Sequence, residues 1–174
     1  MCIRDRLGAT WFDKKYIEQF MYETFETPRY LRGQIEISYV PYTAEWQVSR
    51  KSMVRYNDVA AFTTYGTDRA SAYRLLEDAL NLRDIRIYDT IEDADGRERR
   101  VLNAKETTLA AQKQQLIRDA FKDWIWKDPE RRETLVRQYN EEMNSTRPRE
   151  YDGSHIVFSG MNPEILSLIH ISEP

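Results

Sequence analysis

Apolar residues recur at helical spacing in the segment that follows Asp13. Phe20 and Met21 follow Ile17 by three and four positions, and Pro28 marks the end of the segment. Because an α-helix turns once in 3.6 residues, this spacing places the apolar side chains on one face. Asp13 has a side chain typical of a helix N-cap. We therefore predict a first helix that begins after Asp13 and ends before Pro28.

Two short segments then alternate between apolar and polar residues, which is typical of half-buried strands. Residues 35–39 alternate Ile35, Ile37 and Tyr39 with polar neighbours. Trp46 and Val48 alternate in the same way after an interruption at residues 41–44. The two segments predict a β-hairpin.

A second helix and a second hairpin are predicted further along the chain. Apolar residues at positions 72, 75, 76, 79 and 80 predict a helix, with Asp68 as its candidate N-cap. Apolar positions 85, 87 and 91, the turn signal Asp95-Gly96, and positions 101 and 102 predict a hairpin with a polar tip. Residues 53–65 fit either a buried strand or a short helix.

The apolar pattern is clearest in the last third of the chain. One stripe predicts a helix over about 104–126, and Asp128-Pro129 ends it and starts another, with Asp as N-cap and Pro at the first position. The short joint predicts an αα-hairpin. The first stripe consists of Leu109, Leu116, Ile117, Ala120, Phe121 and Trp124, and the second of Leu135, Val136, Tyr139 and Met143.

These elements predict an α+β fold: helices packed on two β-hairpins, followed by an αα-hairpin and an extended C-terminal linker. We predict an α+β unit over residues 7–103, a helical hairpin over 104–145 and a linker over 146–165. The two ends, 1–6 and 166–174, resemble translated sequencing-adapter sequence, so we expect them to be artefacts and exclude them from the fold prediction.

Composition restricts the class of protein. The 174 residues include 26 Lys+Arg and 29 Asp+Glu, a formal net charge of −3, which excludes a basic nucleic-acid-coating protein and an acidic tail protein. Hydrophobic residues make up 41%, enough for a folded core. Apolar runs are far shorter than the roughly 20 residues of a membrane span. With Cys2 as the only cysteine, we expect a cytoplasmic protein without a membrane partner.

Sequence motifs of enzymes are absent. The glycines do not form a phosphate-binding loop. Asn162-Pro163 is followed by Glu164, whereas an adenine methyltransferase needs a second proline and an aromatic residue there. His155, the only histidine outside the two ends, has no nucleophile elbow beside it. We predict no catalytic, cofactor-binding or metal-binding residue in this chain.

Arginine clusters and three other side chains are the candidate interaction residues. Acidic residues alternate with the arginines, which is more typical of a solvated surface than of a phosphate-binding one, so DNA contact is the minority interpretation. Trp126 lies off the apolar stripe and could cover a neighbouring domain. The candidates for DNA contact are Arg97, Arg99, Arg100, Arg131, Arg132, Arg147 and Arg149, and those for a domain interface are Trp126, Tyr151 and His155.

Several short stretches point to a family. Residues 121–126 (FKDWIW), 139–141 (YNE), 149–155 (REYDGSH) and 160–163 (GMNP), with 7–11 (LGATW) and 17–21 (IEQFM) upstream, carry the similarity. The chain resembles the central segment of very large DNA-processing proteins encoded on conjugative elements, plasmids and phages of gut bacteria. Those proteins join an adenine-specific DNA methyltransferase domain to a Swi/Snf-like superfamily-two helicase domain.

The resemblance implies that methyltransferase motifs precede this region and that the helicase phosphate-binding loop follows it. The chain would then be a non-catalytic connector fragment that positions the two domains and lines part of the DNA path. The parent would use S-adenosylmethionine and ATP with magnesium, and its partners would be DNA and the two domains in cis. The residues themselves leave open a stand-alone nucleic-acid-binding or protein-interaction module that acts through the arginine clusters.

Overall fold

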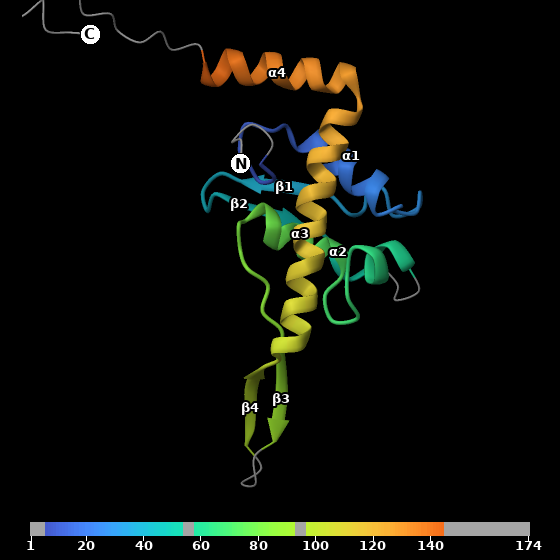
Figure 1. The fold of residues 1–174 in the computed structure, drawn as a ribbon, viewed down its shortest axis with the longest axis vertical. Coiled ribbons are helices and arrows are strands. Elements are labelled where there is room, and N and C mark those ends of the chain that lie inside the picture. The colour runs from blue at the N-terminus through green and yellow to red at the C-terminus, as the bar shows by residue number, and fades with distance from the viewer. Residues whose placement is uncertain (1–5, 54–57, 93–96, 145–174) are drawn as a thin grey trace, which may run out of the picture.

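The part of the chain that the structure describes has the predicted α+β fold. The structure is a computed structural model and describes residues 6–53, 58–92 and 97–144. Helix α3 runs along the longest axis, with one hairpin beyond its N-terminal end and α4 across its C-terminal end (Figure 1). The elements are α1 (Lys14–Thr24), β1 (Ile37–Val40), β2 (Glu45–Val48), α2 (Ala72–Leu80), β3 (Tyr88–Glu92), β4 (Glu98–Leu102), α3 (Ala104–Lys127) and α4 (Pro129–Met143).

Helix α1 begins at the predicted cap. The Oδ1 atom of Asp13 accepts a hydrogen bond from the backbone N–H of Lys15 at 3.1 Å, which satisfies one of the free donors of the first turn. The helix ends at Thr24, before Pro28. Its predicted apolar face is buried and consists of Ile17, Phe20 and Met21.

The first predicted hairpin is confirmed, and α2 covers its outer edge. Tyr39 pairs with Trp46 in an antiparallel register, and Trp46 and Val48 are buried. Asn81 Oδ1 accepts a hydrogen bond from the Trp46 backbone N–H at 2.8 Å, and Glu77 Oε2 accepts one from the Val48 N–H at 2.9 Å. Side chains of α2 and of its C-cap residue thus satisfy the donors that an edge strand leaves free.

Helix α2 is buried as predicted but begins later than the predicted cap. Its N-cap is Ser71 and not Asp68. The backbone groups of Thr67 and Ala70 bond each other at 2.8 and 3.2 Å, so the chain makes a local turn there before the helix can start. Each predicted apolar position of this helix is buried: Ala72, Leu75, Leu76, Ala79 and Leu80.

The segment that the sequence leaves ambiguous is helical where the structure describes it. Lys51–Met53 form a 3₁₀ turn and Ala60–Thr64 a single π-helical turn. Lys113, on α3, closes the π turn, because its Nζ donates to the carbonyl oxygens of Thr63 and Thr64 at 2.8 and 2.9 Å. Of the two alternatives for residues 53–65, the strand is therefore wrong in the described part.

Helix α3 has the predicted length but a different buried stripe. Leu109 and Leu116 were expected in the core, yet they are 40% and 44% exposed. The buried positions 110, 114, 117, 121 and 124 instead follow one another at steps of three or four, and the two leucines lie beside that stripe. Gln114 is tolerated inside because its Nε2 donates to the Arg83 carbonyl oxygen at 2.8 Å.

The joint between α3 and α4 forms as predicted. Asp128 Oδ1 accepts hydrogen bonds from the backbone N–H groups of Glu130 and Arg131 at 3.0 and 3.4 Å, and Pro129 occupies the first turn. Helix α4 turns sharply across the end of α3 (Figure 1). Of its predicted apolar face, Leu135 is buried whereas Met143 is exposed.

A single buried cluster extends across the predicted boundary at residues 103/104. Phe121 of α3 packs edge-on against Phe20 of α1, with ring centroids 5.1 Å apart. Phe25 packs in the same way on Tyr73 of α2 at 5.3 Å. Aromatic rings therefore join three helices. Among the described residues, no helix has the length and apolar character that a membrane span requires.

Candidate functional site

The hairpin β3–β4 forms an arm, defined here as residues 88–102, that projects from the body of the molecule (Figure 1). Its strands pair as predicted, from Tyr88 with Leu102 at the base to Glu92 with Glu98 near the tip. The described strand side chains are exposed, apart from a half-buried Asp89. Ile91 and Leu102, two of the apolar positions that predicted this hairpin, are 50% and 49% exposed. None of the described side chains of the arm belongs to the buried core.

The arm carries three of the predicted arginines but does not gather them on one face. Arg99 and Arg100 are adjacent in β4, and neighbouring residues of a strand point to opposite sides. The Arg100 guanidinium lies 5.3 Å from the centroid of the Tyr88 ring. Arg97 is exposed just before β4 begins. The arginines therefore follow the edge and both faces of a ribbon.

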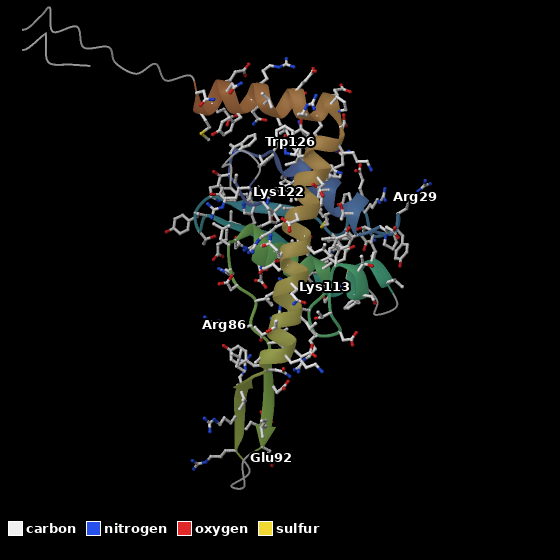
Figure 2. All side chains as sticks on the ribbon, in the orientation of Figure 1. Arg29, Arg86, Glu92, Lys113, Lys122 and Trp126 are labelled. Carbon is white, nitrogen blue, oxygen red and sulfur yellow. The ribbon has the colours of Figure 1, made fainter. Side chains whose placement is uncertain are left out.

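The net charge of the arm disfavours phosphate binding. Residues 88–102 contain five acidic and three basic side chains, a net charge of −2. Glu92 lies directly opposite Glu98 on the same face, and Figure 2 shows Glu92 toward the far end of the arm. A surface of this sign repels a polyanion at long range. The charge balance of the arm therefore does not distinguish it as a nucleic-acid-binding surface.

Polar side chains fix the base of the arm to the body. Asp89 forms an ion pair with Arg69, and Arg69 Nη2 also donates to the Tyr88 carbonyl oxygen at 3.1 Å. Asn103 Nδ2 donates to Asp89 Oδ2 at 2.7 Å, while Asn103 Oδ1 caps α3 by accepting from the Glu106 N–H at 3.0 Å. Hydrogen bonds from Arg69 and then Asn103 lower the pKa of Asp89 below its ordinary value. The Asn103 side chain thus links the arm to the start of α3.

The corner where α3 meets α4 buries one of the predicted arginines. Arg131 is 9% exposed, and its guanidinium carbon lies 3.4 Å from the centroid of the Trp124 ring. Its Nη2 donates to the Trp124 carbonyl oxygen at 2.8 Å. Because the guanidinium is enclosed in this contact, Arg131 forms part of the corner and does not join the exposed arginines.

The same tryptophan also bonds to α1. Trp124 Nε1 donates to Glu23 Oε2 at 2.6 Å, and Gln19 Nε2 donates to Glu23 Oε1 at 2.8 Å. Partial burial would raise the pKa of Glu23, but these hydrogen bonds and the charge of Arg131 outweigh it and hold the pKa below its ordinary value. Helices α1, α3 and α4 therefore meet in a cation–aromatic–carboxylate contact.

A groove of about 820 Å³ lies between the end of α3 and one face of α4. Trp126, a predicted interface residue, forms its α3 side at the corner between the two helices (Figure 2). Val136 supplies an apolar α4 position, and Arg132, another predicted candidate, lies on the rim. This groove is named the corner groove below.

A small cavity of about 10 Å³ adjoins the corner groove and shares Trp126, Arg132 and Val136 with it. Trp11 also lines this cavity and is 7% exposed. Its indole Nε1 is buried and has no hydrogen-bond partner within the described residues. A buried donor without an acceptor is costly, so this atom is a place where a ligand acceptor would be stabilised.

The remaining predicted residues lie outside the described part of the chain. These are Arg147, Arg149, Tyr151 and His155. Within the described residues, no group of three or more His, Cys, Asp or Glu side chains could hold a metal ion. Burial raises the pKa of Tyr73 to about 12, and its hydroxyl lies 2.7 Å from Thr27 Oγ1. It is a neutral structural phenol at physiological pH.

Sequence reasoning missed the residues that shape these two surfaces. Asp89 and Arg69 are 20 positions apart, and nothing in the local pattern pairs them. The Arg131 contact had a detectable signal, because Asp128-Pro129 fixes a tight corner that brings positions 124 and 131 together. The cavity lined by Trp11 had no detectable signal in the sequence, because it depends on how the segment before α1 packs on α4.

Comparison with known proteins identifies a family and no function. The family model described as a domain of unknown function (DUF8437) matches residues 6–145, and the chain belongs to this family. No curated protein and no solved structure matches the chain.

Proposed function

We propose that this family member is a rigid, non-catalytic connector that holds a neighbouring domain at each end of α3. The observation that carries the proposal is the placement of two exposed surfaces at opposite ends of one helix. The arm continues from the N-terminal end of α3, and the corner groove lies at its C-terminal end (Figure 1). With 24 residues, α3 is about 36 Å long at a rise of about 1.5 Å per residue.

The connections at both ends of α3 support a rigid spacer. At the arm, Asn103 both caps α3 and bonds Asp89 of β3. At the corner, Asp128 caps α4 directly after α3 ends, and Arg131 is stacked on Trp124. Neither joint contains a glycine or a long loop. A neighbour bound at one end would therefore keep a fixed orientation relative to a neighbour at the other end.

The proposed context is a DNA methyltransferase/helicase protein of a mobile genetic element. Support for this context comes from the resemblance of residues 121–126, 149–155 and 160–163 to the connector segment of such proteins. In that context the parent, in the cytoplasm, would act on DNA with S-adenosylmethionine and with ATP and magnesium. The connector would bind neither cofactor and would set the distance between the two domains along the DNA path.

The decisive experiment uses the protein encoded by the complete gene. We expect its open reading frame to contain methyltransferase motifs before Leu7 and a helicase phosphate-binding loop after residue 165. In that protein, Lys105 and Lys127 are exposed near the two ends of α3 and can react with a lysine cross-linker. Cross-links from these two lysines to different domains would support the connector. Cross-links from both to the same domain would contradict it.

The exposed arginines of the arm favour a second candidate, a nucleic-acid-binding module. Arg97, Arg99 and Arg100 are exposed on a ribbon narrow enough for a major groove, although the net charge of −2 opposes it. Titration of the chain with duplex DNA at low salt tests this candidate. Each lost phosphate contact should lower the salt slope by about 0.9, so R99A and R100A should each reduce it. Absence of binding at low salt would reject the candidate.

A further inference from the structure

We propose that the outer face of α3 pairs with the same face of a second copy of this chain, in the antiparallel direction. The face is a line of exposed positions separated by alternating steps of four and three residues, which is the spacing with which two helices pack along a shared seam. The proposal goes beyond the connector function and does not depend on it. This face is named the outer seam and consists of Lys105, Leu109, Gln112, Leu116, Asp119 and Asp123.

The middle of the outer seam is exposed and carries no charge. Between residues 105 and 119, all of which the structure describes, the exposed side chains are those of Thr108, Leu109, Ala111, Gln112, Gln115 and Leu116. On α4, by contrast, six of the ten exposed side chains are charged: Glu130, Arg132, Glu133, Arg137, Glu141 and Glu142. A solvated helix face usually carries charged residues, as α4 does. The uncharged leucine pair of α3 is therefore a face that can lose its water to a partner at low cost.

The charges at the two ends of the outer seam select a second copy and its direction. Lys105 is at one end, and Asp119 and Asp123 are at the other. Two antiparallel copies place each Lys105 level with Asp123 of the other copy, and the two-fold axis, level with residue 114, makes this pair twice. Parallel copies would place lysine beside lysine and aspartate beside aspartate, which is unfavourable. The seam is therefore complementary to itself in one direction only.

The charged pair at each end is available for this contact. Lys105 and Asp123 form no ion pair with any other described residue. Asp119 contributes less, because Lys122 Nζ of the same helix lies 3.3 Å from its Oδ1 atom. In the middle of the seam, the antiparallel arrangement brings Leu109 and Leu116 of both copies together around the two-fold axis.

The remaining charges of α3 do not oppose the pairing. The half-buried ones lie beside the seam and not on it: Glu106, Lys113, Arg118 and Lys122. Lys113 is directed toward its own body, because its Nζ donates to the carbonyl oxygens of Thr63 and Thr64. Lys127 is exposed one turn beyond Asp123 and is level with the base of the second copy's arm, whose net charge is −2.

The seam is short, so the dimer is weak. From residue 105 to residue 123, α3 rises about 27 Å, and a strip one helix wide, about 10 Å, covers about 270 Å² on each copy. A stable complex buries about 800 Å² per partner. We therefore expect a dissociation constant of about 0.1 mM. At concentrations well below that value the chain is a monomer, and the seam does not contribute to the stability of the single copy.

Sedimentation velocity of the full 174-residue chain, over concentrations from about 0.01 to about 1 mM, tests the association. We expect a monomer–dimer equilibrium. L116E should raise the dissociation constant at least about tenfold, because it places two carboxylates near the two-fold axis in a contact that excludes water. Its matched control is L82E, the same change at an exposed leucine outside α3, which should leave the dissociation constant unchanged.

Charge reversal tests the direction of the pairing. K105E should weaken the dimer, because it places a glutamate level with Asp123 of the other copy, and the double variant K105E/D123K should restore it. A parallel dimer would respond differently, since both variants would leave like charges facing each other. The matched control for K105E is R86E, which reverses an exposed charge outside α3.

Three results would overturn the proposal. The first is a chain that is monomeric at every concentration, which is also the result expected if another segment of the same chain covers the seam. The second is a dimer that L116E and K105E leave unchanged, because its interface would lie elsewhere. The third is a dimer that K105E weakens and K105E/D123K does not restore. Thermal melting of L116E and L82E at low concentration shows whether each copy is still folded.

Discussion

The body beneath α3 and the arm at its end are stabilised in opposite ways. In the body, Phe20, Phe121 and Trp124 are buried against one another across two helices. In the arm, the described strand side chains are exposed apart from Asp89. Burial of apolar surface stabilises the body, whereas the arm depends on its cross-strand pairing and a polar contact at its base.

This difference separates what the chain needs in order to fold from what it presents to a partner. A two-stranded hairpin with no buried face is marginally stable by itself in water. The arm nevertheless carries Tyr88, Ile91 and Leu102 in exposed positions. Exposed apolar side chains on a rigidly attached ribbon add little to the stability of the body. We therefore propose that they form a contact surface.

The largest loss of stability is expected from F121A in the body. Phe121 is fully buried and packs edge-on against Phe20 and Phe12. Its removal should reduce the free energy of unfolding by about 3–5 kcal/mol, because it loses apolar burial and leaves a cavity. Urea denaturation followed by circular dichroism measures this. A loss below about 1 kcal/mol would show that the aromatic cluster does not hold the helices together.

A smaller effect is expected at the corner from R131A. The Arg131 guanidinium is desolvated over the Trp124 ring, a contact worth about 2 kcal/mol. We expect a loss of that order in the free energy of unfolding, with a change in tryptophan fluorescence. R132A is the matched control, because Arg132 is exposed and its loss should change the free energy by less than about 0.5 kcal/mol. Equal effects would contradict the stacked contact.

The arm should be loosened selectively by D89A. Asp89 joins Arg69 and Asn103 at the base of the arm and lies outside the core. We expect faster amide exchange in β3 and β4 with an unchanged thermal midpoint for the body. A lower thermal midpoint of the whole chain would show that arm and body form one cooperative unit.

The same contact should respond to acid. The pKa of Asp89 is lowered from its ordinary value of 3.8, so the contact contributes fully above that pH. It is lost as the pH falls below 3.8 through the lowered pKa, because protonation removes the charge that Arg69 binds. Amide exchange of the arm should therefore accelerate only below about pH 4 after correction for the intrinsic pH dependence. In D89A this acceleration should disappear.

The smallest effect is expected from L116S. Leu116 has the spacing of a core residue but is 44% exposed. We expect a change in the free energy of unfolding of less than about 0.5 kcal/mol, whereas I117A next to it should cost about 2–5 kcal/mol. Similar losses for L116S and I117A would show that Leu116 contributes to the core, as the sequence predicts.

The local pattern was sufficient for most elements and for some of their ends. Asp13 and Asp128 cap α1 and α4 as predicted, because a capping side chain bonds backbone donors two or three residues away. Asp68 failed as a cap because the bridge between Thr67 and Ala70 holds the chain in a turn. That bridge is also local, but no residue pattern indicates it.

The candidate surfaces were less predictable than the elements. Arg131 was expected among exposed arginines, and the corner encloses it against Trp124. Trp126 was expected at a domain interface, and it lines the corner groove. Sequence composition cannot distinguish an exposed arginine from a stacked one, because both follow the same charge pattern.

By itself, the sequence determined the α+β class, the two hairpins, the order of the helices and the joint at Asp128-Pro129. Those features depend on periodicity and capping within a few residues. Only the tertiary structure decided that the second hairpin leaves the core and that α3 buries Ala110 and Gln114 instead of Leu109 and Leu116. Burial depends on which distant element covers a residue, and periodicity along one segment carries no information about that neighbour.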